Sequence, residues 1–410
     1  MELINRYYFI GGIKVTDLCK KYGSPLYIYD TSIMKSQYDR ICNAFNHVNL
    51  RLHYACKALT NINILKFFNR LGTGIDTVSI QEVYLALKAG FKPQDIIYTP
   101  NCVSMDEYEQ AIEAGVKINI DNISILEQFG HKYGNKVPIG IRVNPHIMAG
   151  GHTKISVGHI DSKFGISIHQ MPHVQRVIST NNIRLEGIHM HTGSDILDAE
   201  VFLKGAEILL NTAKDFPGLD YIDFGSGFKV SYKSDDIETN IEDFGKRISK
   251  RFRQFCKEYG KELTLLFEPG KFLVSEAGYF IAKVNVIKQT TSTVFAGLDT
   301  GLNHLIRPMF YDAYHEIINI SHPFNKPRIY TIVGYICETD TFGYNRKIPE
   351  IFEGDYLAFK NAGAYCFVMS SNYNSRYRPA EIMIHEGKDY LIAKRETFDD
   401  LIKNQIIHDL

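Results

Sequence analysis

Short apolar segments rich in β-branched and aromatic residues alternate with helix-like segments through the first two thirds of this 410-residue chain, and this alternation constrains its fold most strongly. Eight of the apolar segments have the length and composition of buried strands. They are residues 52–58, 74–78, 96–100, 117–121, 140–144, 187–191, 221–225 and 263–270. Eight strand–helix units over about 220 residues predict a (β/α)8 barrel. The alternative is an open doubly wound sheet, which the lack of a Gly-x-Gly-x-x-Gly motif after the first strand disfavours.

The segments between the strands carry signals for helix ends. Ser79 and Glu82 have the spacing of a capping box, and apolar residues at helical spacing follow them. Gly90 then stands where such a helix would end. The capping spacing recurs at residues 104–107 and 124–127, so we expect helices to start there as well.

After about residue 275 the pattern changes to strand-like runs separated by turns, which predicts a second, all-β domain. We expect a barrel over residues 30–275 and a C-terminal β domain over 276–410, joined by a strand from residues 1–29. From its sequence alone that strand, "SPLYIYD", could belong to either domain. A hairpin is expected around Glu386-Gly387-Lys388.

Composition excludes several classes of partner. The net charge is zero, so nothing favours binding to nucleic acid or to an anionic membrane surface. No apolar run approaches the ~18 residues of a membrane span, and the start "MELINRYYFIGG" lacks the pattern of a secretion signal. The seven cysteines show no C-x-x-C spacing, which argues against disulfides or structural zinc and favours a reducing cytoplasm.

Chemically unusual residues fall where the predicted strands end. In a barrel of this kind the carboxyl ends of the strands form the active-site face, so these side chains would share one rim. They are Lys57, Asp76, His189, His191, Asp223 and Glu268. Lys57 is the most informative, because an ammonium group in an apolar segment is costly unless it is paired or loses its proton. A desolvated lysine is a nucleophile suited to Schiff-base chemistry, whereas an ordinary one would extend to solvent.

The other rim residues each allow more than one interpretation. The Gly-Ser-Gly loop at 225–227 could bind a phosphate through its backbone or be an ordinary turn. Glu268 needs a cationic partner, either a basic side chain or a protonated pyridine nitrogen. His189 and His191 share one strand face and could bind metal, stack on an aromatic cofactor or hydrogen-bond within the core. With no third ligand at a familiar spacing, we expect no metal site. Together these groups are the parts of a pyridoxal 5′-phosphate (PLP) site.

Motifs along about residues 20–400 carry a specific resemblance. They include "HYACKA", "GIDTVSIQE", "IRVNP", "GIHMHTGS", "DFGSGF", "FEPGKF", "IRPMFYDAYH", "CETDTF" and "NAGAYCF". In this combination the chain resembles the fold-type III PLP-dependent decarboxylases, and among them those acting on diaminopimelate. The resemblance implies an alanine-racemase-like barrel followed by a β domain, in a homodimer whose active sites lie at the subunit interface.

The activity that the resemblance implies is decarboxylation of an amino-acid substrate, meso-2,6-diaminopimelate, to L-lysine and CO2. One alternative is a polyamine-pathway decarboxylase of the same fold, acting on carboxynorspermidine, ornithine or arginine. Another is a non-catalytic relative that binds PLP without turnover. The presence of Lys57, Glu268 and Cys337 argues against the non-catalytic alternative.

Cofactor contacts follow from the resemblance, motif by motif. Lys57 would form the Schiff base, His191 would stack on the PLP ring, and Glu268 would pair with its pyridine nitrogen. The other cofactor-binding positions would be Asp76, Ser194, Gly225, Ser226, Gly227, Pro269, Gly270, Lys271 and Tyr365.

Substrate contacts are implied in the same way. Arg307 and Tyr311 would hold a carboxylate of the substrate. Cys337 and Glu338 would reach into the partner's active site, where Cys337 would donate a proton and Glu338 would grip the substrate's amino group. Tyr365 and Lys271 would contact the substrate as well as the cofactor.

Two positions depart from the family pattern. Lys271 stands where the family has arginine, which keeps the charge but loses the bidentate fork. Ser226 stands where the family has glycine, so its backbone must adopt a conformation open to a residue with a Cβ. A Gly- and His-rich loop at 146–159 is where we expect mobility.

Overall fold

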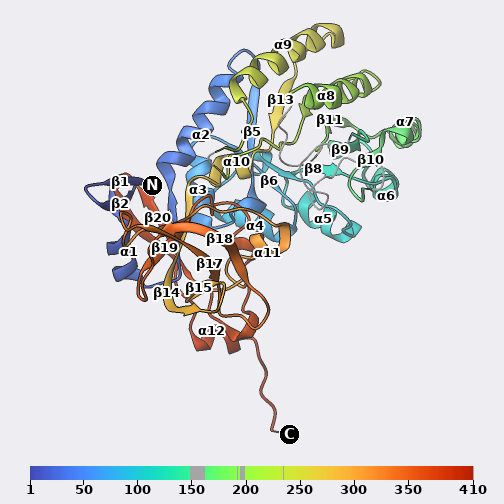
Figure 1. Ribbon diagram of the computed structural model, residues 1–410. Helices are drawn as coiled ribbons and strands as arrows, with labels where there is room; N and C mark the ends of the chain where they lie inside the picture. The colour runs from blue at the N-terminus through green and yellow to red at the C-terminus, as the bar shows by residue number, and fades with distance from the viewer. Residues whose placement is uncertain (148–161, 192, 194–198, 234, 410) are drawn as a thin grey trace. The chain divides into compact units, whose positions relative to one another are not determined.

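The computed structural model divides into two compact units (Figure 1). The barrel unit comprises residues 37–230 and 237–272, and the β unit comprises residues 1–36, 231–236 and 273–410. The structure describes residues 1–147, 162–191, 193, 199–233 and 235–409. Residues 148–159 of the Gly- and His-rich loop, and Ser194, lie outside the described residues.

Eight parallel strands among the described residues of the barrel unit close into a ring (Figure 1). They are β5 (Leu50–Ala55), β6 (Gly74–Thr77), β7 (Ile96–Tyr98), β8 (Lys117–Ile120), β9 (Ile139–Asn144), β11 (Leu185–His189), β12 (Tyr221–Asp223) and β13 (Thr264–Phe267). β13 pairs with β5 to close the ring, and the short β10 (Ile166–Ser167) pairs with β9. The predicted barrel is confirmed, each predicted strand overlaps an observed one, and the open-sheet alternative is wrong.

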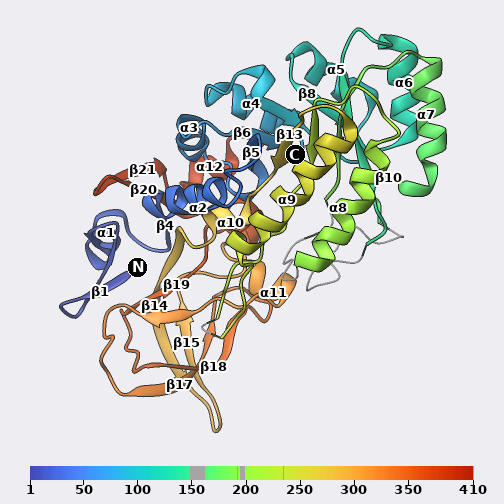
Figure 2. The same ribbon diagram turned by 90° about the horizontal axis from the view of Figure 1, so that it is seen from above.

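Helices connect consecutive barrel strands. They are α3 (Ile62–Arg70), α4 (Ile80–Lys88), α5 (Met105–Glu113), α6 (Ile123–Tyr133), α7 (Met171–Thr180), α8 (Ala199–Ala213) and α9 (Ile241–Tyr259), while α2 (Thr31–Ala44) leads from the β unit into the barrel unit. Figure 2 shows α6 beside α7 and α8 beside α9. Each helix buries one stripe; in α4 this stripe contains Ile80, Val83 and Ala86, as expected for an amphipathic helix on a barrel.

Helix starts agree only in part with the capping signals. Ser79 caps α4 by accepting a hydrogen bond from Glu82 N, and the Glu82 carboxylate accepts one from Val78 N. Ser104 precedes α5 as predicted, but its side chain makes no capping bond. The start expected at residue 124 is wrong, because Asn122 lies two residues earlier and accepts from Ile125 N, the position a cap must satisfy.

The β unit contains a nine-stranded mixed sheet within the described residues. Its strands are β4 (Leu26–Asp30), β14 (Gly278–Gln289), β15 (Val294–Leu298), β16 (Ile317–Asn319), β17 (Pro327–Val333), β18 (Thr341–Pro349), β19 (Tyr356–Phe359), β20 (Ala380–His385) and β21 (Lys388–Ala393). β4 pairs with β14 and β20, so the N-terminal strand joins this unit. A separate small sheet holds β1 (Glu2–Ile4), β2 (Tyr7–Ile10) and β3 (Ile13–Lys14).

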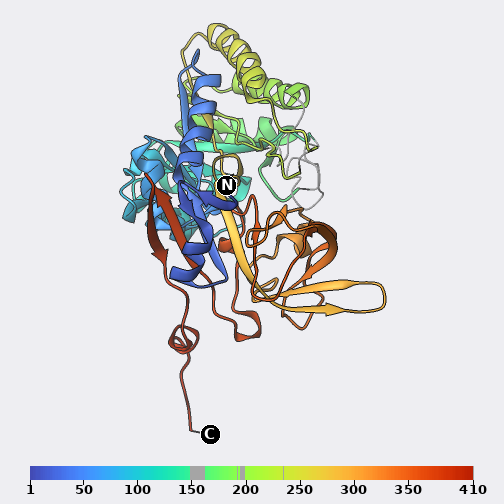
Figure 3. The same cartoon turned by 60° about the vertical axis from the view of Figure 1, so that its left-hand side comes forward.

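Hairpins shape the β unit. β14 and β15 form a long antiparallel arm, drawn in yellow and orange in Figure 3. The hairpin predicted around residues 386–388 is present as β20–β21, and its turn residues Glu386 and Gly387 both have left-handed φ values. Short helices complete the unit: α1 (Val15–Tyr22), α11 (Arg307–Tyr311) and α12 (Phe398–Ile402), while α10 (Lys271–Val274) joins the two units in sequence. Among the described helices, none is both long and apolar enough to cross a membrane.

Candidate active site

Ionisable side chains gather at the carboxyl-terminal ends of the barrel strands, the face that carries active sites in such barrels. Asp76 lies in β6, His189 and Asp223 end β11 and β12, and Glu268 directly follows β13. The strand expected to reach residue 58 ends at Ala55. Lys57 therefore lies in a one-turn 3₁₀ helix (Cys56–Ala58) that continues from β5.

Lys57 forms an ion pair with Asp76. Its Nζ lies 3.4 Å from Asp76 Oδ2, and the lysine side chain is 39% exposed whereas the aspartate side chain is 1% exposed. Burial, aided by the charge of Glu268, raises the pKa of Asp76 to about 6, and the Lys57 ammonium opposes this shift. Lys57 is thus an accessible amine beside a carboxyl group that titrates near neutral pH.

The segment after β13 packs closely on the turn that carries Lys57. Ala55 N donates a hydrogen bond to Pro269 O at 3.2 Å. A Cβ added to Gly270 would lie 3.0 Å from the Cβ atoms of Ala55 and Ala58. Small residues on both sides therefore hold these two backbone segments together, which fixes the position of the lysine turn.

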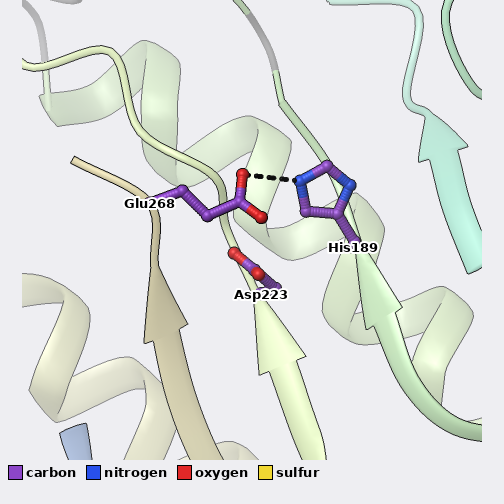
Figure 4. Close-up of side chains that lie close together, drawn as sticks. All are labelled: His189, Asp223 and Glu268. Atoms are coloured by element: carbon purple, nitrogen blue, oxygen red, sulfur yellow. Dashed lines mark hydrogen bonds and ion pairs between the residues drawn. The ribbon is translucent and has the colours of Figure 1, made fainter. Parts of the chain in front are cut away.

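Three buried side chains form a cluster at the ends of β11, β12 and β13 (Figure 4). Each of the three residues, His189, Asp223 and Glu268, has one side-chain N or O atom within 4.8 Å of such an atom in the other two. His189 Nε2 and Glu268 Oε2 are hydrogen-bonded at 3.2 Å. Because this bond joins two members of the cluster directly, we interpret the three residues as a hydrogen-bonded group. The absence of a metal site stays a prediction, although the fold supplies neighbours for His189 that the spacing in the sequence did not reveal.

The two carboxyl groups of this cluster differ in pKa. Burial raises the pKa of Glu268, but His189 and Lys57 lower it more, so it lies below its usual range. Burial, and then the charge of Glu268, raises the pKa of Asp223 well above its usual range. The surroundings therefore displace the pKa values of these two neighbouring carboxyl groups in opposite directions.

The Gly-Ser-Gly loop after β12 uses its glycines for a tight turn. Gly225 and Gly227 have φ values of 62° and 134°, whereas Ser226 lies outside the left-handed region, so its side chain is compatible with this loop. Gly225 N donates to Asp223 Oδ1 at 2.8 Å, and Ser226 N donates to His191 Nδ1 at 3.2 Å. Burial and the charge of Lys57 lower the pKa of His191 well below its usual range, so this imidazole is neutral.

Arg142 is a residue of the site that sequence interpretation missed. It lies in β9, is buried, and its guanidinium carbon is 4.8 Å from the centroid of the Phe164 ring. Burial lowers the pKa of Arg142, while the charges of surrounding carboxyl groups, Glu268 foremost, oppose the shift. The signal that could have found it is the one that pointed to Lys57, a cation within an apolar strand segment.

In the β unit, the structure brings Arg307 and Tyr311 together at the two ends of α11. Arg307 is buried, and its Nη2 donates to Tyr232 Oη at 3.4 Å. Its guanidinium carbon also lies 5.5 Å from the Tyr232 ring centroid and 6.0 Å from that of Tyr311. A buried, permanently charged guanidinium among aromatic rings is suited to binding an anionic group.

Cys337 and Glu338 are exposed on a loop between β17 and β18. Asn374 Nδ2 donates to Cys337 Sγ at 3.4 Å, and Tyr373 Oη donates to Glu338. Tyr365 is partly buried and has a left-handed φ of 57°. The substrate and cofactor roles of these residues stay predictions. The same holds for the substrate and cofactor contacts expected of Lys271, which is partly buried in the barrel unit.

The barrel residues fit the cofactor that the sequence implies. Glu268 Oε1 is buried and, among the described residues, has no fixed donor, as expected of an acceptor for a pyridinium N–H. A Cβ on Gly225 would lie 2.6 Å from Met190 O, so only glycine permits the tight loop there. Together with the accessible amine of Lys57, these features match a lysine-bound pyridine cofactor with a phosphate.

Comparisons with known proteins identify the family. Residues 32–275 match the family described as "Pyridoxal-dependent decarboxylase, pyridoxal binding domain". The diaminopimelate decarboxylase of Methanothermobacter thermautotrophicus is 39% identical over 406 residues, covering 97% of this chain and 95% of that protein. The enzyme of the same name from Aquifex aeolicus is 34% identical, with 96% and 94% covered.

Solved structures agree with this assignment. The crystal structure of diaminopimelate decarboxylase from Methanocaldococcus jannaschii in complex with L-lysine matches with a TM-score of 0.91. It is 30% identical, and the match covers 99% of this chain and 98% of that one. The chain therefore belongs to the diaminopimelate decarboxylase family of PLP-dependent carboxy-lyases.

Proposed function

We propose that the chain removes one carboxylate of meso-2,6-diaminopimelate as CO2 and releases L-lysine, the last step of lysine biosynthesis. The observation that carries this proposal is that an accessible amine, Lys57, and a buried carboxylate, Glu268, directly follow the neighbouring strands β5 and β13. When bound, PLP supplies a protonated pyridine ring that accepts the electron pair left at Cα as the carboxylate departs.

Lys57 binds the cofactor through Nζ, and the same amine displaces the finished product. An amine acts as a nucleophile only after it has lost its proton. Asp76 Oδ2 lies 3.4 Å from Nζ, and its pKa of about 6 suits a group that takes up and returns a proton near neutral pH. We therefore assign Asp76 the role of proton acceptor for Lys57.

Glu268 accepts the pyridine N–H and keeps the ring protonated. His191 packs against the ring face, and because it is neutral it adds no positive charge beside a cationic ring. The phosphate belongs at the loop of residues 225–227. Since the amides of Gly225 and Ser226 already donate to Asp223 and His191, we assign the phosphate to the Gly227 amide and the Ser226 hydroxyl. Ser194, Pro269, Gly270, Lys271 and Tyr365 complete the proposed cofactor contacts.

Arg307 binds the carboxylate at the end of the substrate that does not react. Its guanidinium is buried and always charged, so a substrate with a carboxylate at this end is favoured over one without it. Meso-diaminopimelate carries a second carboxylate at this end, whereas ornithine has only the α-carboxylate that reacts. Tyr311, Lys271 and Tyr365 contribute to the same binding site, and Glu338 holds the distal amino group.

A second copy of the chain completes the site in this proposal. Cys337 and Glu338 are exposed, which leaves them accessible to a partner. Cys337 of one subunit then protonates Cα in the other, and the assembly is a homodimer with shared active sites. None of the seven cysteines forms a disulfide in the described residues, in keeping with a reducing cytoplasm as the proposed compartment.

Product analysis tests the reaction. The purified protein, supplied with PLP, is incubated with meso-diaminopimelate, carboxynorspermidine, ornithine or arginine in parallel, and L-lysine, polyamine products and CO2 are measured. We expect L-lysine and CO2 from diaminopimelate alone. Turnover of only a polyamine precursor would contradict the roles of Arg307 and Glu338. A PLP absorbance band that responds to none of the four amino acids would indicate a non-catalytic relative.

Arg307→Ala tests substrate choice, with Arg328→Ala as the matched control. Arg328 lies in the same unit but is exposed and paired with Glu350. We expect Arg307→Ala to raise KM for diaminopimelate and lower kcat/KM about a hundredfold, as loss of a charged hydrogen bond predicts. Arg328→Ala should leave both constants unchanged. Equal kinetics for the two variants would refute the assignment.

A further inference from the structure

The strand register places His189 and Asp223 directly beside the carboxylate that the cofactor requires. His189 and Asp223 are paired residues of the neighbouring strands β11 and β12, and Asp223 pairs in turn with Leu266 of β13. Glu268 follows two residues later, on the same face as Leu266. The ends of three consecutive barrel strands thus bring one imidazole and two carboxyl groups together (Figure 4).

The hydrogen-bonding capacity of the two carboxyl groups favours a proton on Asp223. Glu268 Oε1 and Asp223 Oδ2 are both buried, and no donor among the described residues reaches either atom. Side-chain atoms of the two residues lie within 4.8 Å of each other, and two carboxylates cannot donate to each other. One proton held by Asp223 supplies the missing donor and also removes the repulsion between two buried like charges.

Asp223 connects Glu268 with the glycine-rich loop. Its Oδ1 accepts from Gly225 N at 2.8 Å, and the Gly225 carbonyl accepts from Glu268 N at 2.7 Å. The Asp223 side chain is therefore fixed by the same loop that we assign to the phosphate. A protonated Asp223 can accept from this loop and donate to Glu268 at the same time.

His189 completes the arrangement from the other side. Its Nε2 faces Glu268 Oε2, and the bond to an ionised carboxylate requires a proton on Nε2. Its Nδ1 is buried without a partner among the described residues. His189 therefore acts on Glu268 as an N–H donor through Nε2.

Charged and titratable groups from every neighbouring element act on Glu268 and Asp223. The groups are Lys57 and His53 on β5 and its turn, Asp76 on β6, Arg142 on β9, His189 and His191 at β11, and Tyr221 on β12. Asp76, like Asp223, is a carboxyl group whose pKa is raised by burial and by the charge of Glu268.

We propose that Asp223, as a buried carboxylic acid, and His189, as an N–H donor, are positioning residues that hold Glu268 ionised and oriented toward the pyridine nitrogen. This inference deepens the proposed function and rests on it for the identity of the ring, but the state of Asp223 is a property of the chain alone. Neither residue touches the reacting atoms. Both act through Glu268, His189 by its hydrogen bond to Oε2 and Asp223 as a neighbouring acid that can donate to the same carboxylate.

The first test uses the protein without cofactor. Carboxyl-¹³C aspartate is incorporated, the Asp223 resonance is assigned by its loss in Asp223→Asn, and its chemical shift is followed from pH 4 to pH 9 by NMR. A protonated Asp223 at pH 7 supports the inference, whether or not the protein turns over diaminopimelate. An ionised Asp223 at pH 7 overturns it, even if PLP binding and lysine release are found. The two failures are thus distinguishable.

The second test uses holoprotein loaded with PLP labelled with ¹⁵N at the pyridine nitrogen. Asp223→Asn retains a donor toward Glu268 and an acceptor for Gly225 N, whereas Asp223→Ala retains neither. In the same way His189→Gln retains an N–H at the Nε2 position and His189→Leu does not. We expect the ¹⁵N signal of the protonated ring in the Asn and Gln variants, and a shift toward the unprotonated ring in the Ala and Leu variants. PLP affinity should fall about tenfold to a hundredfold in the latter two.

A protonated-ring signal that is kept in Asp223→Asn and His189→Gln but lost in Asp223→Ala and His189→Leu distinguishes a positioning role from a structural one. Circular dichroism of each apoprotein confirms that the variants compared are folded. If Asp223→Asn loses the protonated-ring signal to the same extent as Asp223→Ala, Asp223 acts as a carboxylate and the inference is overturned. If His189→Leu keeps that signal, His189 does not act through Glu268.

Discussion

Replacing Gly225 by alanine tests whether the tight turn after β12 is needed for cofactor binding. Gly225 has a φ of 62°, and a Cβ there would lie 2.6 Å from Met190 O and 2.7 Å from His191 Nδ1. Gly218 is a matched control in the same unit. It also has a left-handed φ, 88°, but a Cβ there would meet nothing within 4 Å.

The difference between the two variants isolates the steric contact. Alanine at a left-handed φ costs about 1–2 kcal/mol at either position. Overpacking against backbone and a buried ring adds about 1–3 kcal/mol at Gly225 only. The free energy of unfolding should therefore fall by about 1–2 kcal/mol in Gly218→Ala and by about 2–5 kcal/mol in Gly225→Ala.

Urea denaturation of the apoproteins measures these losses, and titration with PLP measures affinity. Because the new Cβ must displace His191, and Ser226 N donates to that ring, Gly225→Ala should bind PLP at least about tenfold more weakly. Gly218→Ala should bind PLP as the unmodified protein does. Equal losses of stability and equal PLP affinities in the two variants would refute this account of the loop.

Three further predictions follow from pKa shifts and caps. Burial lowers the pKa of His53 to about 3, so below pH 6.5 the unfolded chain binds one more proton than the folded protein, and the free energy of unfolding falls as the pH falls. His53→Gln should abolish this dependence, which amounts to about 1.4 kcal/mol per pH unit between about pH 6 and 4, as measured by urea midpoints. Burial raises the pKa of Asp76 to about 6, so ionisation of this group lowers the free energy of unfolding as the pH rises from about 4 to 6. Asp76→Asn should therefore stabilise the apoprotein at pH 7 by about 1–3 kcal/mol while lowering turnover. Ser79→Ala should cost about 1 kcal/mol, and Ser104→Ala, which loses no capping bond, less than about 0.5 kcal/mol by the same assay.

The barrel could be predicted because its strands are short, buried and separated by helices with clear ends. Gly90 shows how local these signals are: it follows α4 with a φ of 94°, where a residue with a Cβ would be strained. Predictions failed where two local signals compete. Asn122 caps α6 before Ser124 can, and the chain after Ala55 forms a turn although the apolar run continues.

The candidate site was predictable only as a set of strand ends. Barrel geometry implies that Lys57, Asp76 and Glu268 meet at one rim, whatever their distance in the sequence. The pairing within that rim was not predictable. The bond between His189 and Glu268 joins residues 79 positions apart, and the protonation of Asp223 depends on the burial and charges of groups from several strands. Sequence spacing contains neither burial nor the direction of a side chain.

The proposed mechanism places opposite electrostatic requirements on the two sides of the barrel mouth. In that mechanism Lys57 gains and loses a proton during turnover, and its neighbour Asp76 has a pKa of about 6. Glu268 would keep its charge, because the pyridine ring accepts electrons only while its nitrogen stays protonated. The pKa values of Glu268 and Asp223 are displaced in opposite directions. In this proposal the ends of β5 and β6 exchange protons, while the ends of β11, β12 and β13 hold one ionised carboxylate, Glu268.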